Sequence, residues 1–156
     1  MREHKITDQG IYILEIYVPQ KIFIKTSKNG DSQLSVGFYY YIGSAQKNLL
    51  HRLNRHIKKE KIIHWHIDQI TANKYSIIKS IAVFENKEKD FECELCKKIE
   101  EGFNLLHPIK FFGNTDCKKC VSHLLYSAKP IDYNHFSDLY HSMVSFIPLS
   151  SGICDT

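Results

Sequence analysis

Arg52 and His56 are four residues apart in a strongly basic segment, and this spacing suits phosphate binding. On a helix, residues four apart are neighbours, so both would flank the apolar stripe of Leu49, Leu53 and Ile57. An arginine offers a planar fork of N–H donors to phosphate oxygens, and a histidine can exchange a proton near neutral pH. The same pattern also fits a solvated helix face, so phosphate binding is a hypothesis at this point.

The distribution of charge supports that hypothesis. The net charge is only +4, but the basic side chains are concentrated between residues 47 and 61. Such a concentration is typical of surfaces that bind nucleic acid. The side chains that we expect to contact nucleic acid are Lys47, Arg55, Lys58, Lys59, His64 and His66.

The composition predicts one domain that folds without covalent cross-links. A chain of 156 residues buries roughly 70% of the surface that its unfolded state exposes. The five cysteines are an odd, scattered set, and residues 1–10 are too polar for a signal peptide. No apolar run approaches the roughly 20 residues that a membrane-spanning helix needs. We therefore expect reduced thiols, a cytoplasmic location and no membrane association.

The first part of the chain predicts a β-meander. Residues Gly10–Val18 are rich in β-branched and aromatic side chains, and Lys21–Lys25 follows a proline as a second strand. Turn-forming residues at Lys28–Ser32 precede a third strand at Val36–Ile42. Because alternate residues of a strand share a face, this strand places Tyr39 and Tyr41 on one side and Phe38, Tyr40 and Ile42 on the other.

The rest of the chain mixes helices and strands. Gly43-Ser44 offers a turn and a cap for the basic helix. The later predicted elements are a helical turn at His64–Asp68, a strand at Tyr75–Glu85, a helix at Phe91–Glu101 ended by Gly102, and a helix at Cys117–Tyr126 capped by Asp116. This order favours an α+β fold with a small, mostly antiparallel sheet flanked by helices. We assign residues 1–128 to this domain and 129–156 to an extension that packs on the domain or a partner.

Two tripeptides, Gly10-Ile11-Tyr12 and Tyr41-Ile42-Gly43, resemble the motifs that name the GIY-YIG nuclease superfamily. An arginine-bearing helix and a later glutamate-bearing helix follow them in the same order as in that superfamily. Three further segments resemble one small branch of it: HWHID at residues 64–68, ECEL at 92–95, and an FG-x-x-DC…C-x-SH-type segment at 112–123. This branch has an extra strand between the tripeptides, which implies that Lys21–Lys25 joins the sheet.

The resemblance implies a GIY-YIG-like fold and a Mg²⁺- or Mn²⁺-dependent endonuclease that hydrolyses DNA, in repair or in the processing of damaged or branched DNA. It implies that Arg52 binds phosphate oxygens, and that Tyr12 and Tyr41 orient the attacking water or take its proton. It also implies that His56 shares proton transfer or contacts a phosphate. Glu92 is then the metal ligand, because Mg²⁺ binds carboxylate oxygens and keeps most of its waters.

Two alternatives concern the identity of metal ligands. Glu94 competes with Glu92, which we favour because it shares a helical face with Leu95 and Ile99. A histidine pair with a nearby acid at residues 64–68 resembles a metal site, but a helical turn does not bring all three side chains together. We expect Trp65 to pack and one of the histidines to line the substrate groove.

The cysteines allow two interpretations. Cys117, Cys120 and His123 have the spacing of zinc ligands, and Cys93 or Cys96 would complete a tetrahedral set. Free cysteine is also a common small core residue, and we favour this interpretation over structural zinc. The alternative to a nuclease is a non-catalytic nucleic-acid-binding or repair-accessory module, and the third hypothesis is a zinc-stapled interaction domain.

Overall fold

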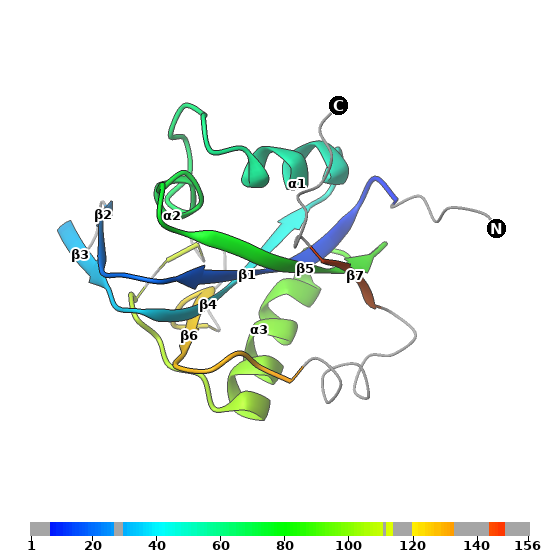
Figure 1. Cartoon of the computed structure of the whole chain (residues 1–156). Coiled ribbons are helices and arrows are strands. Elements are labelled where there is room, and N and C mark those ends of the chain that lie inside the picture. Colours follow the sequence, from blue (N-terminus) through cyan, green and yellow to red (C-terminus); the bar gives the residue numbers. More distant parts are fainter. Residues whose placement is uncertain (1–6, 27–29, 111, 114–119, 133–143, 149–156) are drawn as a thin grey trace.

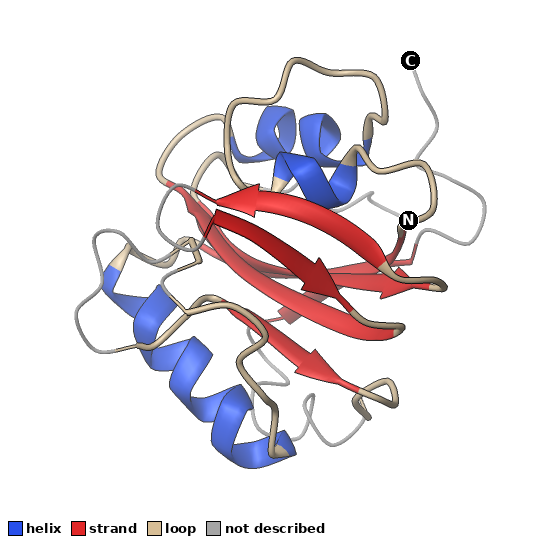
Figure 2. Ribbon diagram, turned by 90° about the vertical axis from the view of Figure 1, so that its left-hand side faces the viewer, coloured by secondary structure: helices blue, strands red, loops and turns tan. Residues whose placement is uncertain are grey.

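The computed structural model describes residues 7–26, 30–110, 112–113, 120–132 and 144–148. It confirms the expected α+β fold, with helices on both faces of an antiparallel sheet (Figures 1 and 2). The strands are β1 (Gly10–Val18), β2 (Ile22–Thr26), β3 (Gly30–Leu34), β4 (Gly37–Ala45), β5 (Ile77–Glu85), β6 (Leu124–Ser127) and β7 (Val144–Pro148). The helices are α1 (Leu49–Ile57), α2 (Asp68–Thr71) and α3 (Asp90–Phe103). Among the described residues, none of the helices has the length and apolar character to cross a membrane.

β1 is the central strand of the main sheet, whose strand order is β6-β4-β1-β5-β7. It pairs antiparallel with β4 on one side and with β5 on the other. Because helices cover both faces, nearly every residue of β1 is buried, which explains why its sequence is apolar except for Glu15. The predicted alternation in β4 is confirmed: Tyr39 and Tyr41 face one core cluster, whereas Phe38, Tyr40 and Ile42 face the other.

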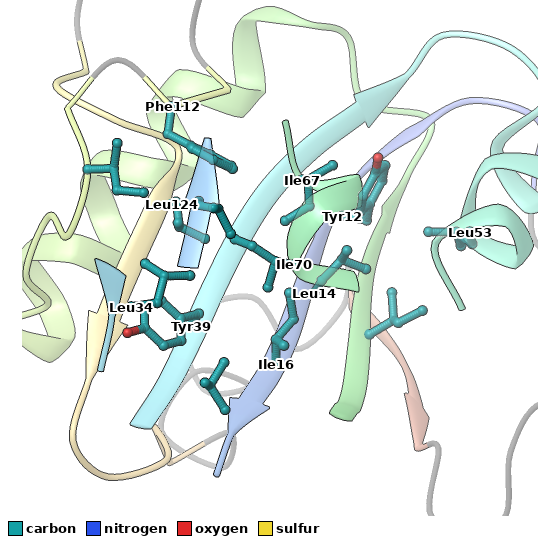
Figure 3. Close-up of a cluster of buried hydrophobic side chains, with 14 of the residues drawn as sticks. Tyr12, Leu14, Ile16, Leu34, Tyr39, Leu53, Ile67, Ile70, Phe112 and Leu124 are labelled. Carbon is teal, nitrogen blue, oxygen red and sulfur yellow. The ribbon is translucent and has the colours of Figure 1, made fainter. Parts of the chain in front are cut away.

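The two core clusters lie on opposite faces of the sheet. α1 and α2 cover one face and α3 covers the other (Figures 1 and 2). In the cluster under α1 and α2, Leu53, Ile67 and Ile70 pack against side chains of β1 (Figure 3). The periodicity of Leu49, Leu53 and Ile57 therefore predicted the buried face of α1 correctly.

β2 does not join the main sheet, contrary to our expectation for Lys21–Lys25. Among the described strands it pairs only with β3, a strand that replaces part of the predicted turn, in a separate two-stranded sheet. The physical reason is that β4 and β5 already occupy both edges of β1, so the strand that follows β1 in sequence finds no free edge there. Gln69 instead ties this small sheet to α2 by accepting a hydrogen bond from the backbone N–H of Lys25 at 2.7 Å.

The predicted helix at Cys117–Tyr126 is wrong for its described C-terminal part, which forms β6. Leu124 and Leu125 are both fully buried but belong to opposite core clusters, so the apolar pattern has the period of a strand. β6 then pairs with β4, from Tyr41 opposite Leu124 to Phe38 opposite Ser127. The predicted cap at Asp116 and the start of that helix lie outside the described residues.

The predicted helix ends also differ from the structure. Gly43 and Ser44 belong to β4, and α1 begins only after Asn48, which adopts a left-handed backbone conformation with φ 58°. α3 continues past Gly102 and ends at Asn104, whose φ of 55° is also left-handed. Asparagine tolerates this conformation better than most residues, so it can end a helix where glycine is expected.

Candidate active site

Tyr12 lies directly opposite Gly43 in the β1–β4 ladder, and the two residues depend on each other. A Cβ atom at Gly43 would lie 2.6 Å from ring atoms of Tyr12, closer than real side chains approach. The glycine therefore leaves the space in which the Tyr12 ring packs across the sheet. This packing lets the Tyr12 hydroxyl reach α1, where it lies 2.7 Å from His56 Nε2.

The Tyr12–His56 contact joins two neutral groups. Burial raises the pKa of Tyr12 well above its usual value, and Tyr41 adds to this effect, while Arg52 opposes it by charge and a side-chain hydrogen bond. Burial, together with the positive charge of Lys61, lowers the pKa of His56 to about 3. Because both groups are uncharged near neutral pH, we infer that the Tyr12 hydroxyl donates its hydrogen bond to His56 Nε2. His56 Nδ1 is buried and has no hydrogen-bond partner among the described residues.

Tyr41 extends the same cluster towards the edge of β4. Its ring meets His56 and Phe112 edge-on, with centroids 6.2 Å and 6.3 Å away. Loss of hydration raises the pKa of Tyr41, and the negative charge of Glu92 raises it further. The two tyrosines of the tripeptides therefore stand on one face of the sheet, beside the helix that carries Arg52 and His56.

Trp65 orients the two arginines of α1. The guanidinium carbons of Arg52 and Arg55 lie 4.8 Å and 4.4 Å from the centroid of its ring, within the range of a cation–π interaction. Arg52 also donates a hydrogen bond to the backbone carbonyl of Ser44. The turn before α2 therefore brings the side chains of both arginines to the same tryptophan. Trp65 packs, as predicted.

Asp68 stabilises the positions of Trp65 and Arg55 through hydrogen bonds to its carboxylate. Arg55 donates two hydrogen bonds to its carboxylate, at 2.7 and 2.8 Å, so the Arg55 fork is engaged within the fold. The backbone N–H groups of His64 and Trp65 donate to the same carboxylate at 2.9 and 2.8 Å. Sequence reasoning treated Asp68 only as a candidate metal ligand and missed this role, which depends on a partner thirteen residues away.

The remaining predicted nucleic-acid contacts fall into two groups. Lys47, Lys58 and His64 are exposed side chains on or near α1. Lys59 donates to the backbone carbonyls of Asn73 and Ser76, and the His66 ring lies 5.8 Å from that of Phe112. The first group is therefore available at the surface, whereas His66 packs within the fold and Lys59, although exposed, has its ammonium group engaged by backbone carbonyls.

Glu92 reaches this region from α3, on the opposite face of the sheet. Its side chain is buried, as expected, whereas Glu94 is exposed and lies 3.9 Å from Lys98. Glu92 Oε1 lies 2.8 Å from His123 Nδ1, and both residues are buried. Sequence reasoning did not anticipate this pair.

His123 connects the two faces at the edge of β4. Its carbonyl accepts a hydrogen bond from Ile42 N–H at 3.0 Å, and its own N–H donates to the Phe112 carbonyl at 2.8 Å. The left-handed Gly113 follows, and a Cβ atom there would lie 2.9 Å from the Tyr41 ring and 3.6 Å from His123 Cβ. Tyr41 and His123 thus pack around Gly113, which brings Glu92 close enough to raise the pKa of both site tyrosines.

Two sets of groups in this region have the chemistry of metal ligands. The Glu92 carboxylate offers hard oxygen atoms. Cys93, Cys120 and His123 form the second set, with ligand atoms within 4.8 Å of one another. The expectation of reduced thiols holds for Cys96 and Cys120 but is wrong for Cys93, which is in a disulfide with a partner outside the described residues.

The comparisons with known proteins give one match. Neither the curated proteins nor the solved structures yield a significant match to this chain. One family model, described as a domain of unknown function, matches residues 11–145 and so covers α1, α3, β6 and both tripeptides except Gly10. The chain therefore belongs to the DUF123 family.

Proposed function

We propose that this domain is a divalent-metal-dependent endonuclease that hydrolyses DNA phosphodiester bonds, in repair or in the processing of damaged or branched DNA. The observation that carries the proposal is the convergence of Tyr12, His56 and Arg52, with the Tyr12 hydroxyl 2.7 Å from His56 Nε2 and Arg52 near enough to oppose the rise in the Tyr12 pKa. The resemblance of the two tripeptides to those of GIY-YIG nucleases supports the same chemistry and substrate class. We also propose a cytoplasmic location from the thiol form of Cys96, and the disulfide of Cys93 is the observation against it.

Hydrolysis of a phosphodiester requires an oxygen nucleophile in line with the leaving group and stabilisation of the charge that develops on phosphorus. Arg52 can stabilise the developing charge, because its planar guanidinium can donate two hydrogen bonds to phosphate oxygens. The stack on Trp65 and the bond to the Ser44 carbonyl fix the orientation of the guanidinium before substrate arrives.

The Tyr12–His56 pair supplies a route for the proton of the attacking water. A neutral Tyr12 orients the water and can pass its own proton to His56 Nε2 as it accepts one from the water. In the free chain burial and neighbouring cations, including Lys61, hold the pKa of His56 at about 3. A bound phosphodiester brings negative charge beside the same cations and therefore raises the affinity of His56 for this proton.

Glu92 fits a magnesium or manganese ion. It is buried near Tyr12 and Tyr41, and its hydrogen bond with His123 involves only Oε1 of the carboxylate. Mg²⁺ commonly binds one or two carboxylates and keeps several waters, so a single protein carboxylate is enough. When bound, the ion would stabilise negative charge on the phosphate and on the leaving oxygen.

One observation favours the alternative, a nucleic-acid-binding module without activity. Burial raises the pKa of both Tyr12 and Tyr41, so each tyrosine gives up its proton less readily than a free tyrosine and is less able to take part in proton transfer. If substrate and metal do not change this, the domain binds phosphates through α1 but does not cut.

Nicking of supercoiled plasmid and of branched DNA, with Mg²⁺, Mn²⁺ or EDTA, tests the proposal. We expect metal-dependent cutting that falls about a hundredfold or more in Arg52→Ala, and a loss of cutting in Glu92→Ala and Glu92→Gln. Glu94→Ala is the matched control, because this exposed glutamate is on the same helix. DNA binding without cutting by the unmodified chain would establish the binding module instead.

A further inference from the structure

Two cysteines and a histidine gather where α3 meets the segment before β6. Cys93 belongs to α3, whereas Cys120 and His123 precede β6 in the sequence. Their sulfur and nitrogen atoms all lie within 4.8 Å of one another, and Cys120 and His123 are buried. We propose that these three residues bind a zinc ion in the reduced chain, and that Glu92 orients His123 as a ligand.

The hydrogen bond with Glu92 determines which nitrogen of His123 can bind a metal. The Glu92 carboxylate accepts the hydrogen bond from Nδ1, at 2.8 Å, so Nδ1 carries the proton. In the neutral ring the lone pair is then on Nε2, and Nε2 lies 3.8 Å from Cys93 Sγ. In the reduced chain a thiolate at Cys93 would face this lone pair, and a metal ion between the two atoms would be bound by both.

The distances suit zinc. With zinc–sulfur bonds of about 2.3 Å and zinc–nitrogen bonds of about 2.1 Å, tetrahedral geometry separates the two ligand atoms by about 3.6 Å. The 3.8 Å between Cys93 Sγ and His123 Nε2 is close to this value. In the same geometry two sulfur ligands are separated by about 3.8 Å. Because the ligand atoms of the three residues already lie within 4.8 Å of one another, small side-chain movements would bring them to zinc-binding distances.

Glu92 gives the site the second shell that zinc histidines usually have. A histidine that binds zinc through one nitrogen commonly donates its other N–H to a carboxylate, which fixes the ring and increases its basicity. The buried Glu92–His123 pair has this geometry. Cys96 is not a member of the group, and its thiol donates to the backbone carbonyl of Ser122 at 3.2 Å.

Zinc binding requires the thiol form of Cys93. A phosphine reductant such as tris(2-carboxyethyl)phosphine cleaves the disulfide by supplying two electrons. The sulfur atoms take up two protons from water, and the phosphine becomes a phosphine oxide. The Cys93 and Cys120 thiols then lose their protons to solvent as zinc binds, because zinc takes cysteine as the thiolate. The zinc site therefore forms in the reduced chain and is blocked while the disulfide persists.

The test measures bound zinc in the reduced, full-length chain after dialysis, without DNA. We expect about one zinc ion per chain, and cobalt substitution should produce the charge-transfer absorption of cobalt–thiolate bonds. Cys120→Ser and His123→Gln should remove this binding, and Glu92→Gln should weaken it by about 10-fold to 100-fold. Cys96→Ser and His107→Ala are the matched controls and should keep it, since His107 pairs with Glu100 away from the group.

Removal of zinc from the unmodified chain provides a readout that does not depend on whether a variant folds. A strong chelator should lower the melting temperature under reducing conditions, and added zinc should restore it. Absence of bound zinc in the reduced chain, or zinc affinity unchanged in Cys120→Ser and His123→Gln, would overturn the proposal. Loss of zinc in Cys96→Ser would show that the ligand set is wrong. The nuclease proposal is unaffected by each of these results, because zinc content is measured without substrate.

Discussion

Replacement of Asp68 by asparagine should destabilise the fold and release Arg55. The Asp68 side chain is fully buried, with 0% exposed, whereas Arg55 is 23% exposed. The Asp68 carboxylate accepts hydrogen bonds from Nη1 and Nη2 of Arg55. It also accepts hydrogen bonds from the backbone N–H groups of His64 and Trp65. An asparagine keeps one acceptor oxygen but places an N–H₂ group against these donors, so part of the network is lost.

The magnitude follows from the pKa of Asp68. Burial raises this pKa, but the hydrogen bonds from Arg55, Trp65 and His64 outweigh burial, and the pKa falls from 3.8 to about 2. That difference corresponds to about 2 kcal/mol of stabilisation by the charged form. Because the pKa of the folded state is the lower one, this stabilisation is fully present above pH 4, about half remains at pH 3, and little remains at pH 2.

Urea denaturation at pH 7 and at pH 3 measures this effect, with the fluorescence of the single tryptophan as the signal. We expect Asp68→Asn to lower the free energy of unfolding by about 2 kcal/mol at pH 7 and by about half as much at pH 3. The control Asp31→Asn, at an exposed site on β3, should change it by less than about 0.5 kcal/mol. An Asp68→Asn effect as small as that of the control, or one that grows in acid, would refute the reasoning.

Three further predictions concern the site. Gly43→Ala should lower the free energy of unfolding by about 2 kcal/mol in the same urea titration, because the new Cβ would meet the Tyr12 ring. The control Gly102→Ala, whose Cβ would have no described atom within 4 Å, should preserve or raise the free energy of unfolding. Tyr12→Phe should slow DNA cutting about a hundredfold. Tyr39→Phe, which also loses a hydroxyl hydrogen bond, should cut at the rate of the unmodified chain. Equal cutting rates in the two variants would exclude Tyr12 from proton transfer. Lys58→Ala should reduce the salt dependence of DNA affinity by about one phosphate contact, measured by fluorescence anisotropy, and an unchanged slope would place Lys58 outside the interface.

Local patterns predicted the elements that local forces determine. β1 matches its predicted limits because its β-branched and aromatic residues favour a strand wherever it lies in the sheet. The stripe of Leu49, Leu53 and Ile57 predicted the buried face of α1 for a similar reason, since periodicity alone defines a helical face. Neither prediction required knowledge of a distant partner.

Predictions that depended on competition for partners were wrong. β2 was expected in the main sheet, but the edges of β1 were taken by strands from later in the chain. Leu124 and Leu125 were expected in a helix, and the open edge of β4 makes them a strand with one leucine on each face. The cysteine–histidine group was anticipated in part, because the spacing of Cys120 and His123 suggested zinc ligands that Cys93 or Cys96 would complete, although core cysteines were favoured.

The sequence by itself determined that Arg52 and His56 share a helical side and that two tyrosines follow the same strand-forming pattern. Only the tertiary structure decided that Tyr12 reaches His56 across Gly43, that Asp68 binds Arg55, and that Glu92 pairs with His123 from the opposite face of the sheet. The physical reason is the sequence separation over which each kind of interaction acts. Helical and strand periodicity act over a few residues, whereas these contacts join residues up to forty-four positions apart and exist only after the sheet has formed.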